Sequence, residues 1–258
     1  MTNEQWIDII NPLQTSWATW GVTILCAMII GISKSGLKGF GMITIPILAN
    51  LYGGMLSTAI ILPFLVFGDT YALYFYRASA EWKYIKKVYP WALVGIAVAL
   101  VIGKFISDSQ FRYAIAISVL ICLIILVYKE LKGGKMDFVK RDWFSTTLGL
   151  SGGFATMIGN AAGPIFNLYL LSMRLPKNTF IATGAWFFLT LNLIKIPLHL
   201  WVWDSMNMKT LQLNFVLLPT LLAGATFGKY LVKKIPERPY RIFVIVTMGV
   251  TSILLFFK

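Results

Sequence analysis

Gly31-Ile32-Ser33-Lys34-Ser35-Gly36-Leu37-Lys38-Gly39-Phe40-Gly41 is a glycine- and lysine-rich stretch that separates two uncharged apolar runs, residues 17–30 and 42–51. Lipid offers no hydrogen bonds to such a break, so its backbone must be satisfied by protein or by water in a cavity. Charged residues at membrane depth are rare and usually functional. The stretch therefore predicts two half-helices that meet at a polar cavity.

The same framework returns in the second half of the chain, within residues 149–153 and 159–164. Four pairs of identical residues share one separation of 118 positions: Gly31 and Gly149, Ser33 and Ser151, Gly41 and Gly159, and Pro46 and Pro164. Glycine-interrupted hydrophobic segments in corresponding positions of two halves point to the binding site of a transporter. The spacing thus predicts an internal duplication.

The composition of the chain is that of a membrane protein. It is 58% hydrophobic and 13% charged, with a mean hydropathy of +0.75, which indicates a polytopic membrane protein. The net charge of +13 is not read as nucleic-acid binding, because the basic residues lie in short loops between apolar segments, as the positive-inside rule describes.

Ten hydrophobic segments are expected, five in each half. A full crossing needs about 20 apolar residues, so segments 40–52, 143–158 and 161–173 are short, and each is either a re-entrant hairpin arm or a short span. The segments are 16–32, 40–52, 56–76, 88–106, 111–128, 143–158, 161–173, 179–200, 211–231 and 241–257.

An odd number of segments per half predicts that the second half is inserted upside down relative to the first. The expected fold is an all-α polytopic membrane protein with two inverted-topology repeats, each opened by glycine-broken short helices or a re-entrant hairpin. The expected divisions are a tail at 1–15, a first repeat at 16–128, a cytoplasmic linker at 129–142 and a second repeat at 143–258.

Basic residues give the orientation, since 17 of the 23 lysines and arginines lie in alternate loops. The lysine- and arginine-rich side is expected to be cytoplasmic. Both termini are then expected on the outer side of the membrane.

The first break is a candidate anion site. Lys34 and Lys38 are four residues apart and share a face if the helix persists, and half-helix ends with free backbone N–H groups attract anions. Ser35 and Gly36 belong to the same site, and Gly159, Asn160 and Gly163 of the second break are expected to complete it. Two other readings stay open: loop lysines that obey the positive-inside rule, and glycines that only pack helices.

Three further polar residues lie inside apolar segments: Asp69, Asn192 and Lys195. A buried charge is costly unless it is paired or hydrated. Two alternatives stay open. In one, Asp69 and Lys195 form a structural salt bridge between the halves. In the other, Asp69 is a protonatable coupling group, while Lys195, with Asn192, contacts the substrate.

Enzymatic function is not expected. The chain has one histidine and two cysteines, and no nucleophile–base set, paired carboxylates or metal cluster lies in the apolar segments. No phosphate-binding Gly-x-x-x-x-Gly-Lys-[Ser/Thr] motif is present, and no cofactor or metal is expected. The expected partners are the bilayer and a small anion, with proton coupling and a homodimer both compatible with the sequence.

The residues of the first break up to Pro46, the sequence Gly-Asn-Ala-Ala-Gly-Pro at 159–164, and Asn192 with Lys195 resemble the TauE/SafE family of sulfite exporter-like membrane proteins. The resemblance covers residues 16–257. It implies an inner-membrane carrier of sulfur-containing anions such as sulfite, sulfoacetate or related sulfonates. The residues themselves predict only a carrier with a cationic site at mid-membrane, which also suits a carboxylate.

The leading hypothesis is a secondary transporter that moves a small anion by alternating access. An anion channel is the competing hypothesis, and a purely structural protein is disfavoured because buried Lys34, Asp69 and Lys195 are costly without a use.

Overall fold

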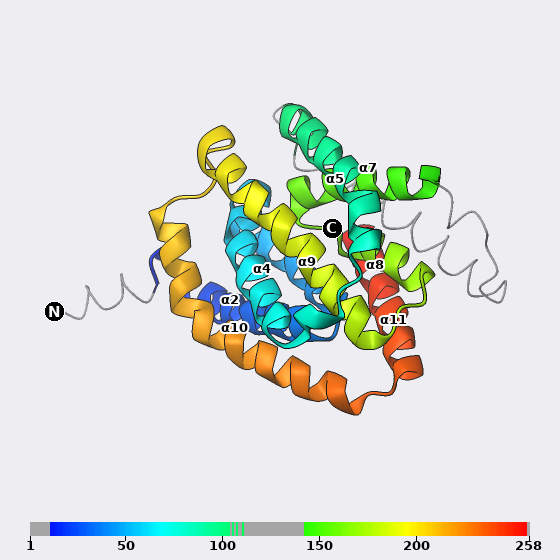
Figure 1. Cartoon of the computed structure of the whole chain (residues 1–258). Coiled ribbons are helices and arrows are strands. Elements are labelled where there is room, and N and C mark those ends of the chain that lie inside the picture. The colour runs from blue at the N-terminus through cyan, green and yellow to red at the C-terminus, as the bar shows by residue number, and fades with distance from the viewer. Residues whose placement is uncertain (1–10, 104, 106, 108–109, 111–141, 257–258) are drawn as a thin grey trace.

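The computed structural model describes residues 11–103, 105, 107, 110 and 142–256 (Figure 1). The predicted segment 111–128 and nearly all of the linker at 129–142 lie outside the described residues. Throughout the described part of the chain the regular secondary structure is helical, which confirms the all-α prediction.

Apolar runs become helices at nearly the predicted positions. The described elements are α2 (Trp17–Ser35), η1 (Phe40–Ile43), α3 (Thr44–Tyr52), α4 (Gly54–Tyr76), η2 (Arg77–Ser79), α5 (Trp82–Ile102), α7 (Asp142–Gly159), α8 (Gly163–Ser172), α9 (Lys177–Pro197), the π-helix η4 (Leu198–Val202), α10 (Met208–Lys234) and α11 (Glu237–Phe256).

Five helical stretches are long and apolar enough to cross a membrane, which supports a multi-pass protein. They are Trp17–Ser35, Gly54–Ser79, Trp82–Ile102, Lys177–Val202 and Met208–Lys234. In contrast, α3 has 9 residues and α8 has 10. At about 1.5 Å per residue each is roughly 15 Å long, about half the hydrocarbon thickness of ~30 Å. Neither α3 nor α8 can cross alone.

The first break is shorter than the sequence predicted. Residues 31–35 continue α2 as regular helix, and only residues 36–39 leave it. Gly39 has a φ of 97°, a left-handed conformation that glycine adopts without a steric cost. In the second half, residues 149–153 are likewise helical within α7, and the break comes at residues 160–162. Pro164 then opens α8, where a missing N–H is harmless.

Helices from the two halves pack in a crossed arrangement. The most extensive contacts join α2 to α10 and α7 to α5, while α4 packs against α9 at the centre (Figure 1). The first helix of each half therefore lies against the fourth helix of the other half.

Glycines make these two crossed interfaces alike. A Cβ at Gly31 would meet the Leu221 carbonyl and the Ala225 nitrogen, and a Cβ at Gly149 would meet the Val88 carbonyl at 2.8 Å and the Ala92 nitrogen at 3.3 Å. Gly31 and Gly149 are 118 positions apart. The residues that they contact are 133 positions apart in both cases: Val88 corresponds to Leu221, and Ala92 corresponds to Ala225. The matching contacts let the backbones approach closely on both sides of the molecule.

A second pair of glycines repeats the match from the opposite helices. Gly95 of α5 faces the Leu150 carbonyl, and Gly228 of α10 faces the Ile32 carbonyl at 2.5 Å. Gly95 and Gly228 are 133 positions apart, and the residues that they face, Ile32 and Leu150, are 118 positions apart. Each interface therefore has a glycine on both of its helices.

We expect Gly31→Ala to lower the free energy of unfolding by about 1–3 kcal/mol, because the added methyl group overlaps the backbone of α10. Gly21→Ala on the same helix is the matched control. No heavy atom lies within 4 Å of a Cβ there, and alanine favours helix, so its stability should be unchanged or higher. Thermal unfolding in detergent measures both, and equal midpoints would contradict the close contact.

Candidate anion-binding site

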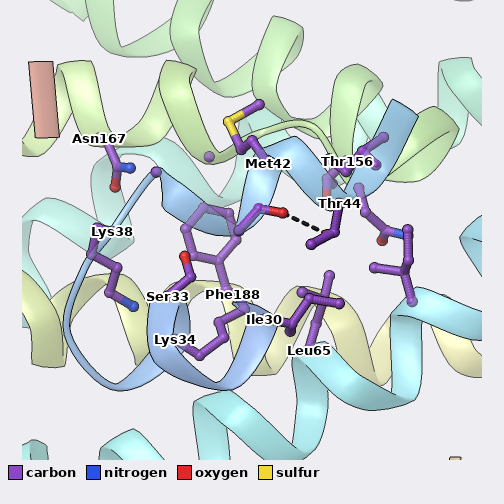
Figure 2. Close-up of a pocket in the computed structure, with 16 residues that line it drawn as sticks. Ile30, Ser33, Lys34, Lys38, Met42, Thr44, Leu65, Thr156, Asn167 and Phe188 are labelled. Atoms are coloured by element: carbon purple, nitrogen blue, oxygen red, sulfur yellow. Dashed lines mark hydrogen bonds between the residues drawn. The ribbon is translucent and has the colours of Figure 1, made fainter. Parts of the chain in front are cut away.

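A cavity of about 70 Å³ lies where the two breaks meet. Its walls come from α2, the turn after α2, α3, α4, α7, α8 and α9. One water needs about 10–15 Å³ of such space, so the cavity has room for a small ion. Its polar lining consists of Ser33, Lys34, Lys38, Thr44, Thr156, Asn160 and Asn167 (Figure 2).

Lys38 is the exceptional residue of this lining. Its side chain is 5% exposed, and its Nζ has no hydrogen-bond partner within the described residues. The turn at residues 36–39 directs the side chain toward the side of the cavity where Ser33 lies (Figure 2). A buried ammonium group without a partner is costly. An electron-rich group in the cavity would supply the missing partner of this ammonium group.

Lys34 and Lys38 do not share a helix face, because α2 ends at Ser35. The prediction based on four-residue spacing is wrong in its geometry. The turn after α2 nevertheless brings both side chains to the same cavity.

Lys34 is paired with an acid that lies outside the cavity lining. Its Nζ is 2.7 Å from Asp69 Oδ2, and it lies 4.8 Å from the centre of the Phe188 ring. Asp69 is fully buried in α4 and also accepts a hydrogen bond from Asn192 Nδ2 at 3.3 Å. The ion pair of Asp69 is thus with Lys34 of its own half, which contradicts one of the two alternatives that the sequence left open, a salt bridge between Asp69 and Lys195.

Lys195 serves the second break. Its Nζ donates to the Thr156 carbonyl at 2.8 Å, to Thr156 Oγ1 at 3.0 Å and to Asn160 Oδ1 at 2.6 Å. The Thr156 carbonyl, in the last turn of α7, also accepts from the Asn160 N–H at 3.1 Å, and a positive charge at the end of a helix complements the helix dipole. Lys195 is fully buried behind the cavity lining, so it acts here as a cap for α7.

Asn160 is held in an unusual conformation. Its φ is 54°, which asparagine tolerates better than most residues. Its side chain accepts from Lys195 and donates to the Thr58 carbonyl of α4 at 3.1 Å. The second break is therefore fixed to both α9 and α4.

The structure brings four of the predicted site residues to the cavity: Lys34, Lys38, Asn160 and Gly163. The other predicted residues, Ser35, Gly36, Gly159, Asn192 and Lys195, and the coupling candidate Asp69, do not line it.

Ser35 and Gly36 lie away from the cavity because α2 stays helical past Gly31. Ser35 Oγ donates to the Gly31 carbonyl at 3.1 Å and faces Gly228 of α10. The carbonyl of Gly36 accepts from Tyr240 of α11 at 2.7 Å. Both residues thus join α2 to the C-terminal helices.

Several lining residues were not predicted: Ser33, Thr44, Thr156, Asn167 and Phe188. Thr156 had a signal in the sequence, since it stands 118 positions after Lys38. Thr44 Oγ1 donates to the Gly41 carbonyl at 2.6 Å (Figure 2). Asn167 and Phe188 lie in continuous apolar helices, where no local pattern marks them.

We expect Asn160→Ala to be less stable than Asn160→Gly, and both to be less stable than wild type. Both variants lose the bonds to Lys195 and Thr58, and alanine in the left-handed region costs roughly a further 1–2 kcal/mol. Thermal unfolding in detergent gives the order. Equal stability of the two variants would show that the left-handed conformation is not retained.

Comparison with curated proteins finds no match, and comparison with solved structures finds none either. The model of one family, described as "Sulfite exporter TauE/SafE", matches residues 23–255. This range contains both breaks, the cavity and the crossed helix interfaces. The chain belongs to the TauE/SafE sulfite exporter family.

Proposed function

We propose that the protein is a secondary transporter that carries a small sulfur-containing anion, such as sulfite, sulfoacetate or a related sulfonate, across the inner membrane. The observation that carries the proposal is the Lys38 ammonium group, which is buried, lines the cavity and lacks a partner within the described residues. Family membership adds the membrane context and the sulfur chemistry.

The donors around the cavity suit an oxyanion. Lys38 and Lys34 supply ammonium groups, while Ser33 and Asn167 supply a hydroxyl and an amide. Charge-assisted hydrogen bonds to oxygen are the strong ones. Ile61, Leu65 and other apolar side chains complete the wall. A carboxylate would satisfy the same donors, so the sulfur assignment rests on the family.

Alternating access is supported by the crossed packing. Each half contributes a break to the cavity, and the first helix of each half packs on the fourth helix of the other through matched glycines. Inverted repeats around a central site are a common basis for transporters that open to either side in turn. We infer that the two halves are inverted repeats. When they exchange conformations, the cavity opens to the other side of the membrane.

Lys38→Ala should weaken saturable uptake of labelled sulfite or sulfoacetate into proteoliposomes. A hydrogen bond to a charged group contributes about 1.5–3 kcal/mol, so the half-saturating concentration should rise roughly tenfold to a hundredfold. Lys86→Ala is the matched control, since Lys86 is exposed on α5 and lies outside the cavity.

Equal uptake by Lys38→Ala and Lys86→Ala would show that Lys38 does not bind the anion. Current that does not saturate with anion concentration would identify the competing function, an anion channel. Absence of uptake of both anions by well-folded wild type would reject the sulfur-anion proposal.

The proposed orientation places the loop before α5 in the cytoplasm and the loop before α10 outside. Ala78 and Asn207 are exposed positions in these two loops. With Cys26 and Cys122 replaced by alanine, Asn207→Cys should react with a membrane-impermeant maleimide in intact cells. Ala78→Cys should react only after the membrane is permeabilised, and the reverse pattern would invert the topology.

A further inference from the structure

Two buried oxygen atoms at the centre of the bundle lack a hydrogen-bond donor within the described residues. Within the described residues, neither Asp69 Oδ1 nor Asn192 Oδ1 has a hydrogen-bond partner, although both side chains are 0% exposed. The two belong to one pair, because Asn192 Nδ2 donates to the other oxygen of Asp69 at 3.3 Å. Buried acceptors are normally satisfied, so a pair of unsatisfied acceptors indicates a ligand that supplies a donor.

We propose that Asp69 and Asn192 form a proton-binding site, and that Lys34 couples its occupation to anion binding in the cavity. The coupling rests on the proposed transport function, whereas the proton site does not. A proton that arrives from water at Asp69 Oδ1 turns the carboxylate into a neutral carboxylic acid. The acid O–H then donates to Asn192 Oδ1, while the amide N–H still donates to the acid's other oxygen.

A proton fits this site better than a metal cation. Lys34 of α2 lies 2.7 Å from the carboxylate, and Lys38 and Lys195 add positive charge from the turn after α2 and from α9. The other elements packed on α4 keep their charges away from this carboxylate. Lys229 of α10 lies over Phe75, Arg77 of η2 is exposed, Asp142 of α7 pairs with Lys87, and α3 is uncharged. A metal ion would face three ammonium groups and find only two free oxygens.

Lys34 links the proton site to the cavity because it belongs to both. Its side chain is 12% exposed and lines the cavity, while its Nζ bonds to Asp69. Protonation removes the negative charge that holds Lys34 and leaves its ammonium group available to an anion. One proton and one anion therefore bind together: the pair adds no net charge when the anion is hydrogen sulfite and one negative charge when it is doubly charged sulfoacetate. A proton gradient drives either anion toward the alkaline side.

The coupling is tested with the full chain in liposomes and labelled sulfite or sulfoacetate. Wild type should accumulate several-fold more anion when the outside is acidic than when no pH gradient exists. In Asp69→Asn this ratio should fall to about one, whatever the absolute rate. Glu81→Gln, which changes an exposed acid paired with Lys83, should keep the wild-type ratio. A gradient effect retained in Asp69→Asn, or a requirement for sodium in place of protons, would overturn the coupling.

Infrared difference spectroscopy of the purified protein tests the proton site without any transport. Titration of wild type should reveal the carbonyl stretch of a buried carboxylic acid, absent from Asp69→Asn and shifted in Asn192→Leu. No such band, or a band that survives Asp69→Asn, would overturn the site, and a band unmoved by Asn192→Leu would overturn the pairing. If neither anion is carried, the proposed transport fails, and this titration still decides the proton site.

Discussion

Positive charge inside an apolar bundle is the constraint on which the rest of the structure depends. Lys34, Lys38 and Lys195 reach the same region as one acid, Asp69. Three ammonium groups against one carboxylate leave an excess of positive charge. An uncompensated charge is very costly in a medium of low polarity. The fold must therefore supply each ammonium group with oxygen atoms or reserve it for a ligand.

The three ammonium groups are accommodated in three different ways. Asp69 neutralises Lys34, and the carbonyl end of α7 together with Asn160 receives Lys195. Lys38 lacks a partner within the described residues and faces the cavity. The carbonyl of Thr156, in the last turn of α7, accepts from the Asn160 N–H at 3.1 Å and also from Lys195 Nζ at 2.8 Å. The break after Gly159 adds the Asn160 Oδ1 atom as a further acceptor for this buried lysine.

Among the described residues, the sequence predicted the helical segments and both breaks, because hydrophobic runs and repeated glycines are local signals. It did not predict that residues 31–35 stay helical. Glycine has low helix propensity, but Gly31 lies against the backbone of α10, and that tertiary contact outweighs the local preference. For Asp69 and Lys195 the sequence left two alternatives open, a mutual salt bridge or separate roles. Their partners depend on how α2, α4, α7 and α9 meet in the bundle, where Asp69 pairs with Lys34 and Lys195 caps α7. Asn167 and Phe188 joined the lining through packing alone.

This separation of Asp69 from Lys195 has a functional consequence. A direct ion pair between α4 and α9 would satisfy both charges permanently and leave Lys34 without an acid. In the observed arrangement, Lys195 is satisfied by uncharged oxygens of the second break, so its capping role is independent of Asp69. In the proposed coupling, Asp69 can release Lys34, the lysine that lines the cavity, without disturbing Lys195. Lys195 then fixes the geometry of the second break, and Lys34 responds to the anion.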